Sequence, residues 1–391
     1  MKFIHAGDVH LGNPFSGLDQ QLPYELKKQI QNATITAFTT MIDQAINSAV
    51  DFILLPGDLY NSTQTSPIIQ DVVSTQFERL NTANITVYLS FGNHDFAADT
   101  QPHLPWPDNV HVFNQDVHTY QLSTHDDKLV AITGFSYQTQ RQTKGLAGDF
   151  PIRDRQVDYH IGMYHGTVGT EGDAYAPFNV SDMLAKRYDY WALGHIHVRQ
   201  TLNQVPFIGY SGNMQGLNRK ETGEKGYYLV EENNQQLIPH FVPVAPILWD
   251  TLCIDEMSSE DELIQYLATF PREKMTLLSV IIQANHLPES FKQRLYSHII
   301  LDKLRQEELD QIWVVKLIYN PKDVLSFTDN IDQQYWQEAF NEIDHHFRID
   351  DYLSNQVPTD IREFFLDGVG MDSIKIRMKQ IIEERRQNHE D

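Results

Sequence analysis

The stretch Phe52-Ile53-Leu54-Leu55-Pro56-Gly57-Asp58 shows the construction that decides the fold class of this chain. A short apolar run of this kind is typical of a strand buried on both faces, as in parallel sheets. Glycine then permits a sharp turn, and a carboxylate follows at once. Four further segments also end an apolar run with a glycine or tight turn and a side chain that can bind a metal: Ala6-Gly7-Asp8-Val9-His10, Phe91-Gly92-Asn93-His94-Asp95, Met163-Tyr164-His165-Gly166 and Leu193-Gly194-His195-Ile196-His197. Because open α/β sheets collect their ligands at the carboxyl ends of strands, we expect these polar tips to meet at one place.

Further apolar runs alternate with helical patterns up to about residue 245. Strand-like runs occupy 85–89, 130–133 and 190–193, and residues 30–50 carry apolar side chains at helical spacing. The helical stripe consists of Ala33, Ala37, Met41, Ala45 and Ala49. This alternation predicts an α/β fold in which a β-sandwich is flanked by helices.

Three regions follow from these patterns: 1–245, 246–325 and 326–391. The first boundary is suggested by a proline-spaced stretch, Pro239, Pro243 and Pro246. Beyond it, residues 251–322 follow the order strand, helix, strand, helix, strand, which predicts a small α/β accessory (capping) domain. Its first helix should start at Ser258-Ser259-Glu260-Asp261-Glu262, a hydroxyl cap followed by early acidic residues. The last region has a charge-rich helical pattern.

The bulk composition, 41% hydrophobic and 21% charged, is that of a globular protein. No apolar run approaches the roughly 18–20 residues that a membrane span needs. His5 and Asp8 interrupt the apolar N-terminus, unlike a secretory signal. Cys253 is the single cysteine, which excludes an intrachain disulfide. We therefore expect a cytoplasmic protein without a membrane partner.

The charge balance is unusual for a protein that handles nucleic acid. With 53 acidic and 30 basic side chains, the formal net charge is -23, and no dense basic run occurs. Phosphate backbones are normally held by clustered Lys and Arg. Bound metal ions or a partner protein can supply that positive charge instead. The composition thus argues against a free-standing DNA binder without excluding a nuclease subunit.

The polar tips offer the donor atoms that divalent cations bind. Asp and Asn supply hard oxygens and neutral His supplies a borderline nitrogen, a mixture that suits Mn²⁺ or Fe²⁺ most readily, with Zn²⁺ as an alternative. No cysteine is among them, which argues against a structural zinc site. Taken singly, an Asp-X-His pair arises by chance and Gly57-Asp58 is usually a turn. Five such segments at strand ends together predict two metal ions held close to one another.

In this order the segments resemble the calcineurin-like metallophosphoesterase superfamily over roughly residues 1–245. More narrowly, residues 5–12 and 57–60 resemble the SbcD-like DNA repair exonuclease family. The run 188–197, followed by Ser211-Gly212-Asn213-Met214-Gln215-Gly216, resembles the YhaO branch of that group. The resemblance implies a metallophosphoesterase-type β-sandwich and a hydrolase that uses two divalent metal ions.

Roles for individual residues also come from this resemblance. It implies one ion held by Asp8, His10 and His197, and a second held by Asn93, His165 and His195. Asp58 would bridge the two ions. His94 would be catalytic, stabilising or protonating the leaving oxygen, and Asp95 would orient His94 through a hydrogen bond.

Some positions are less clear. Asn61 stands where the family often has an acidic residue or His, which leaves the balance of exonuclease and endonuclease action open. We interpret His5 as a packed core residue, and His160 as pointing away from the site because it begins its strand. His103, His111, His118 and His125 are interpreted as ordinary surface residues.

A last helix is predicted for residues 372–388, with an apolar stripe of Ile374, Met378, Ile381 and Ile382. The stripe packs either on its own domain or on a partner protein. Resemblance to SbcD-like nucleases favours the second, with an SbcC/YhaN-type coiled-coil ATPase as the partner, and it also suggests a homodimer.

Two functions therefore remain open at this point. The first is a two-metal-dependent DNA phosphodiesterase (exonuclease or endonuclease) subunit acting in DNA repair, with Mn²⁺ as its metal. The alternative is a calcineurin-like phosphatase or phosphodiesterase acting on small molecules or phosphoproteins, which the acidic charge favours. The metal-binding residues alone do not separate them, since the chemistry is shared. A decayed site is disfavoured because every ligand position is filled.

Overall fold

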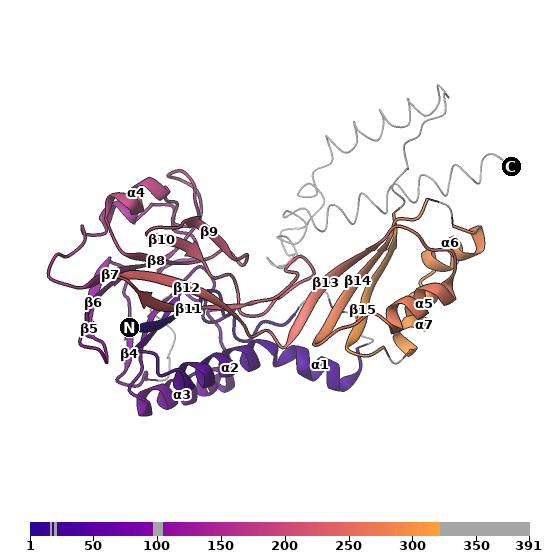
Figure 1. Ribbon diagram of the computed structural model, residues 1–391, viewed down its shortest axis with the longest axis horizontal. Coiled ribbons are helices and arrows are strands. Elements are labelled where there is room, and N and C mark those ends of the chain that lie inside the picture. Colours follow the sequence, from indigo (N-terminus) through magenta and orange to yellow (C-terminus); the bar gives the residue numbers. More distant parts are fainter. Residues whose placement is uncertain (16–17, 19–21, 97–104, 286, 308, 321–391) are drawn as a thin grey trace, which may run out of the picture. The chain divides into compact units, whose positions relative to one another are not determined.

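The computed structural model describes residues 1–320 except 16–17, 19–21, 97–104, 286 and 308 (Figure 1). The predicted region 326–391, its apolar stripe and His103 lie outside the described residues. Among the helices that are described, none is long and apolar enough to cross a membrane.

Two six-stranded sheets hold most of the strands (Figure 1). The first has the order β12-β11-β1-β2-β3-β4 and the second β5-β6-β7-β8-β10-β9. Strands of the first sheet are β1 (Lys2–His5), β2 (Phe52–Pro56), β3 (Thr86–Ser90), β4 (Val110–Val112), β11 (Gly226–Asn233) and β12 (Gln236–Pro243). Those of the second are β5 (His118–Ser123), β6 (Leu129–Gly134), β7 (Tyr159–His165), β8 (Tyr190–Gly194), β9 (Gln200–Asn203) and β10 (Phe207–Tyr210). Both sheets are parallel at their centres; the first is antiparallel at its β11–β12 edge and the second at both edges.

The two sheets pack together through an apolar core. Phe3 of β1 stacks on Phe52 of β2, with ring centroids 4.8 Å apart, and meets Tyr190 of β8 edge-on at 5.3 Å. Strand β2 is buried along its whole length. Phe52 and Leu54 belong to the core between the sheets, and the alternate residues pack with the helices on the other side. The predicted β-sandwich flanked by helices is therefore confirmed, and the four predicted apolar runs form β2, β3, β6 and β8.

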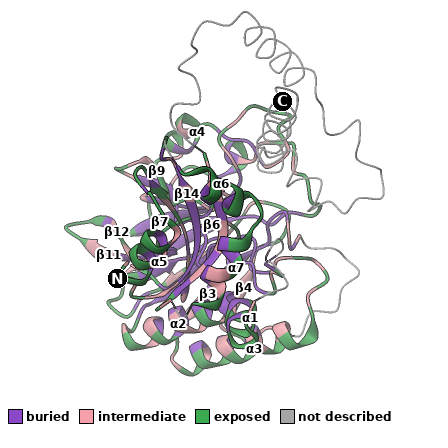
Figure 2. Cartoon of the chain, turned by 90° about the vertical axis from the view of Figure 1, so that its right-hand side faces the viewer, coloured by how far each residue is buried: buried purple, intermediate pink, exposed green. Residues whose placement is uncertain are grey.

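Helices α2 (Ala33–Asn47) and α3 (Pro67–Thr82) flank the first sheet, with their outer faces exposed (Figure 2). Helix α1 (Tyr24–Gln31) precedes them, and its buried residues Leu26 and Ile30 cluster with Trp249 and Leu277 further along the chain. Ala37, Met41 and Ala45 are buried, as the stripe predicted. The prediction was wrong at the end of this helix, because Ala49 is exposed and lies beyond it. Ala49 adopts the left-handed conformation (φ 47), and the Val50 N–H bonds back to the carbonyl of Ala45, which closes the helix earlier than its apolar pattern indicates. Two short pieces, η1 (Ala147–Asp149) and α4 (Val180–Ala185), complete this part.

A three-stranded parallel sheet, β13-β14-β15, follows in the chain. Its elements are β13 (Ile247–Ile254), α5 (Glu260–Ala268), β14 (Met275–Ile282), α6 (Glu289–Tyr296), α7 (Ile299–Gln306) and β15 (Ile312–Tyr319). The Ser259 hydroxyl caps α5 by accepting the Glu262 N–H at 3.2 Å, as predicted. The single helix expected before the last strand is instead two helices. His298 interrupts it, since its left-handed backbone (φ 61) cannot continue α6.

Candidate metal centre

The polar tips of both sheets converge at the carboxyl ends of their parallel strands. Asp8 and His10 follow β1, Asp58 follows β2, and residues 93–95 follow β3, all in the first sheet. His165 ends β7, while His195 and His197 follow β8, both in the second sheet. The two sheets are joined here directly, because the carboxylate of Asp8 accepts the His195 N–H at 2.9 Å.

Left-handed backbone recurs at these tips. Asp8 (φ 53), His10 (φ 51), Asp58 (φ 54) and His195 (φ 103) all have positive φ without being glycine. Each such residue costs of the order of 1–3 kcal/mol, and such strain clusters at functional sites. The cost is tolerated because the strained conformations turn these side chains into a shared space.

One glycine shows how closely the loops approach each other. A Cβ built on Gly92 would lie 2.6 Å from Nε2 of His165 and closer still to Oδ1 of Asp58. Any other residue at this position would displace one of these two side chains.

The first group of candidate ligands is Asp8, His10 and His197, whose donor atoms all lie within 4.8 Å of one another. Nε2 of His10 lies 2.9 Å from Nε2 of His197. Two ligands at about 2.1 Å from one ion and at a right angle to each other lie about 3 Å apart, so this separation suits a shared cation. Burial raises the pKa of Asp8 to about 6, since a charged carboxylate is poorly solvated there.

The second group is Asp58, His165 and His195, with donor atoms again within 4.8 Å. Asn93 joins it: its Oδ1 lies 3.0 Å from Nε2 of His165 and 3.0 Å from Nδ1 of His195. Burial lowers the pKa of His195 to about 3, so its ring is neutral and offers a lone pair at neutral pH.

Asp58 lies between the two groups. Its Oδ2 is 3.7 Å from Nε2 of His10 and 3.4 Å from Nε2 of His165. Burial by itself would raise the pKa of Asp58, but the surrounding imidazoles, led by His165, hold this pKa below its usual range. One ionised carboxylate is therefore in reach of both groups.

The hydrogen bonding of His165 tests whether these residues fit a bound cation. Its Nδ1 lies 3.0 Å from the carbonyl oxygen of Pro56, so that nitrogen carries the proton and donates it. In a neutral ring, Nε2 would then present a lone pair to two further acceptors, Oδ1 of Asn93 and Oδ2 of Asp58. Acceptors this close repel one another unless positive charge lies between them. Among the described residues, the buried Nδ1 of His10 also has no hydrogen-bond partner. The donor set therefore fits a pair of divalent cations.

His94 lies beside this centre. Its backbone N–H donates to Oδ1 of Asp58 at 2.9 Å, and a nitrogen of its ring is grouped with donor atoms of His10 and Asp58. Nδ1 donates to the backbone carbonyl of Asn61 at 3.2 Å, which leaves Nε2 free of that contact.

The prediction that Asp95 forms a hydrogen bond with the His94 ring was wrong. The carboxylate of Asp95 accepts the backbone N–H groups of Gly92 at 2.7 Å and Tyr60 at 3.0 Å instead. It is buried and fastens the loop after β3 to the loop after β2, whereas the carbonyl of Asn61 orients the His94 ring. Burial raises the pKa of Asp95 to about 7.

Comparison with known proteins adds the family. The sequence profile described as "Calcineurin-like phosphoesterase" matches residues 1–199, about half of the chain and all of the strand-end segments. The chain belongs to this family. Its members use a dinuclear metal centre, so this phosphoesterase carries candidate metal-binding residues of the expected kind.

Individual relatives of this phosphoesterase include both uncharacterised and named proteins. It is 40% identical over 259 residues to "Uncharacterized metallophosphoesterase YhaO" of Bacillus subtilis, a match that covers 65% of this chain and 63% of the relative. It is 24% identical to the SbcD subunit of the nuclease SbcCD of Staphylococcus saprophyticus, covering 63% and 70%. With "DNA double-strand break repair protein Mre11" of Thermoplasma acidophilum it shares 24% identity, covering 60% and 63%. The phosphoesterase thus matches less than two thirds of the YhaO and Mre11 relatives.

Sequence reasoning missed Glu221, whose Oε1 accepts the Nδ1–H of His197 at 3.0 Å. Burial opposes the charged ring, but the hydrogen bond and negative charge of Glu221 raise the pKa of His197 to about 9. Glu221 lies five residues beyond the run that ends at Gly216, in a loop without a strand-end pattern, so no local signal pointed to it.

The described histidines among those interpreted as core or surface residues lie outside the centre. His5 is buried and bonds to the Tyr190 hydroxyl and the Leu193 carbonyl, and His160 bonds to the Thr133 hydroxyl, so both are core residues. His118 is exposed, and His125 is a surface residue that pairs with Asp51. The interpretation of His111 as an ordinary surface residue was wrong, because it is half-buried and packs against the rings of Tyr88 and Tyr120.

Proposed function

We propose that this phosphoesterase is a DNA phosphodiesterase subunit, an exonuclease or endonuclease that uses two Mn²⁺ ions and acts in DNA repair. The observation that carries the proposal is the pair of ligand groups joined by Asp58, with the His94 ring beside them. In the proposed assignment, Asp8, His10 and His197 hold one ion and Asn93, His165 and His195 the other. Asp58 is shared between them.

Two bound divalent ions supply Lewis acidity and a nucleophilic water at neutral pH. The chain itself orients the phosphate and handles the proton of the leaving oxygen. His94 keeps its Nδ1 proton on the Asn61 carbonyl, so Nε2 is the nitrogen left to pass a proton to the leaving oxygen. Asp95 keeps the loop of His94 in place through the Gly92 and Tyr60 N–H groups.

DNA is the proposed substrate because two relatives are named a nuclease subunit and a DNA double-strand break repair protein. The net charge of -23 weighs against DNA binding by this chain alone. We therefore include a coiled-coil ATPase of the SbcC/YhaN type in the proposal as the partner that supplies basic surface. Deleting residues 370–391, which include the predicted apolar stripe, should abolish co-purification with such an ATPase. Unchanged co-purification would reject that docking site.

The acidic charge specifically favours a second candidate, a phosphodiesterase of small molecules. The test is cleavage of end-labelled linear and hairpin DNA by the purified protein with Mn²⁺, beside bis-p-nitrophenyl phosphate. Asp58→Ala and His94→Ala serve as variants. DNA cleavage lost in both variants would support the nuclease and reveal its polarity. If only the small diester is hydrolysed, the assay is repeated with the ATPase partner added. DNA cleavage in its presence would then support the nuclease proposal, and no cleavage would favour the small-molecule enzyme.

A further inference from the structure

Glu221 has an unusually complete set of hydrogen bonds for a carboxylate outside the predicted site. Only 9% of this residue is exposed, although glutamates are rarely this buried. Oε1 accepts from Nδ1 of His197 at 3.0 Å and from Nδ2 of Asn218 at 2.7 Å. Oε2 accepts from the Leu217 N–H at 2.8 Å and from Nδ2 of Asn213. The carboxylate is therefore fixed in position by donors other than His197.

This fixed carboxylate determines how the His197 ring is used. Because Nδ1–H is donated to Glu221, the neutral ring carries its lone pair on Nε2, which lies 2.9 Å from Nε2 of His10 in the first ligand group. A carboxylate bonded to the outer nitrogen of a ligand histidine fixes its tautomer and orientation and makes it a better donor. We propose that Glu221 is the positioning residue that holds His197 for the first metal ion, an inference that rests on the proposed two-metal function.

The loop that carries Glu221 is itself bonded to the three-stranded sheet. The indole Nε1–H of Trp249 on β13 donates to the carbonyl of Gly216 at 2.9 Å, and the Gly223 N–H donates to the carbonyl of Trp249 at 3.0 Å. Nδ2 of Asn213 and the N–H of Leu217, from the same loop, hold Glu221. The chain of contacts thus runs from β13 through Glu221 to His197.

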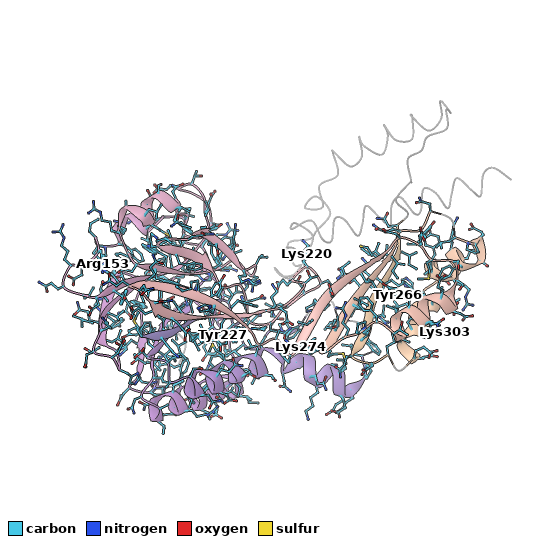
Figure 3. All side chains as sticks on the ribbon, in the orientation of Figure 1. Arg153, Lys220, Tyr227, Tyr266, Lys274 and Lys303 are labelled. Carbon is cyan, nitrogen blue, oxygen red and sulfur yellow. The ribbon has the colours of Figure 1, made fainter. Side chains whose placement is uncertain are left out.

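The test is calorimetric titration of the full chain with Mn²⁺, comparing wild type, Glu221→Gln and Glu224→Gln. Gln has the size of Glu but lacks its charge, so we expect one of two Mn²⁺ sites to weaken by about 10–100-fold in the first variant, compared at a pH where the His197 ring is neutral in both proteins. Glu224 is the matched control, since it lies in the same loop but pairs at 2.9 Å with the partly exposed Lys274 (Figure 3). Its variant should bind Mn²⁺ like wild type. Wild-type affinity in Glu221→Gln would overturn the inference alone, whereas a wild-type protein that binds fewer than two ions would overturn the proposed function as well.

A double-mutant cycle separates positioning of His197 from a general structural role. If Glu221 acts through His197, then His197→Ala and the double variant His197→Ala/Glu221→Gln should bind Mn²⁺ equally. A further loss in the double variant would show that Glu221 acts elsewhere and overturn the inference. If Glu221→Gln does not fold, Asn218→Ala replaces it, because it removes one donor to Oε1 and keeps the charge. Weaker binding of one ion then supports the inference, and unchanged binding overturns it.

Discussion

Gly92 lies where a side chain would enter the second ligand group, and Gly92→Ala probes how tightly that group is built. The new Cβ would lie 2.6 Å from Nε2 of His165, where ordinary contact begins at 3.4 Å, so a shift of 3.4 − 2.6 = 0.8 Å is needed. Metal–ligand distances are held to about ±0.2 Å. We therefore expect the affinity for the ion of His165 to fall by about 100-fold or more, the upper end of the loss from disturbing the surroundings of a ligand. The other ion should also bind more weakly, because the Cβ lies closer still to the shared Asp58.

The same substitution overfills a packed place, which costs about 1–3 kcal/mol of unfolding free energy and leaves most domains folded. Calorimetric titration with Mn²⁺ and urea unfolding without metal measure the two effects separately. Gly148→Ala is the matched control, since a Cβ there would meet nothing within 4 Å, and it should match wild type in both assays. Two Mn²⁺ ions bound with wild-type affinity by Gly92→Ala would refute the assignment of His165 and the shared Asp58 as metal ligands.

Asp95→Asn should lower the free energy of unfolding in urea by about 1–3 kcal/mol, because its amide NH₂ would face one of the two N–H donors that the carboxylate accepts; an unchanged value would argue against this role. Affinity for Mn²⁺ should rise between about pH 6 and pH 9. The reason is that Glu221 raises the pKa of His197 to about 9, and this ring must lose its proton before it binds the ion, whereas His195 is already neutral. Calorimetry in buffers of different ionisation enthalpy detects the released proton, and pH-independent binding would contradict the assignment of His197. Trp249→Phe removes the indole donor to Gly216, whose carbonyl still accepts from Nε2 of Gln215. It should therefore lower the free energy of unfolding by only about 0.5–1.5 kcal/mol and weaken one Mn²⁺ site; stability loss with intact Mn²⁺ affinity would show that the loop holds Glu221 without Trp249.

The strand ends were predictable because their signal is local. An apolar run, a glycine and a polar residue in succession indicate where a parallel strand ends, and parallel strands end at one edge. That reasoning predicts that residues such as Asp8, Asp58 and His195 meet at one place, and the structure brings them together. The local pattern does not predict which residue bonds to the histidine nitrogen that faces away from the metal ion.

What was missed depends on contacts between loops. Asp95 was expected to bond to its neighbour His94, but the turn after β3 directs its carboxylate back to the Gly92 and Tyr60 N–H groups. Glu221 reaches His197 across 24 positions of sequence. The division between α6 and α7 was also hidden, because the residue that turns the chain is His298 rather than a glycine. Each of these outcomes is set by backbone geometry that apolar periodicity does not encode.

The acidic composition takes on a different meaning once the charge of the proposed centre is considered. Asp8 and Asp58 are the two carboxylates in the ligand groups, and the histidines there bind as neutral rings. Two divalent ions bring four positive charges against these two negative ones and the carboxylate of Glu221 beside His197, so the loaded centre is locally positive despite the chain's net charge of -23. Screening confines that attraction to about 8 Å at physiological ionic strength. A single phosphodiester group would be held within this range, whereas the flanking phosphates of a long DNA would meet the acidic remainder of the chain. The proposed DNA activity therefore depends on basic surface from a partner, and hydrolysis of a small diester does not.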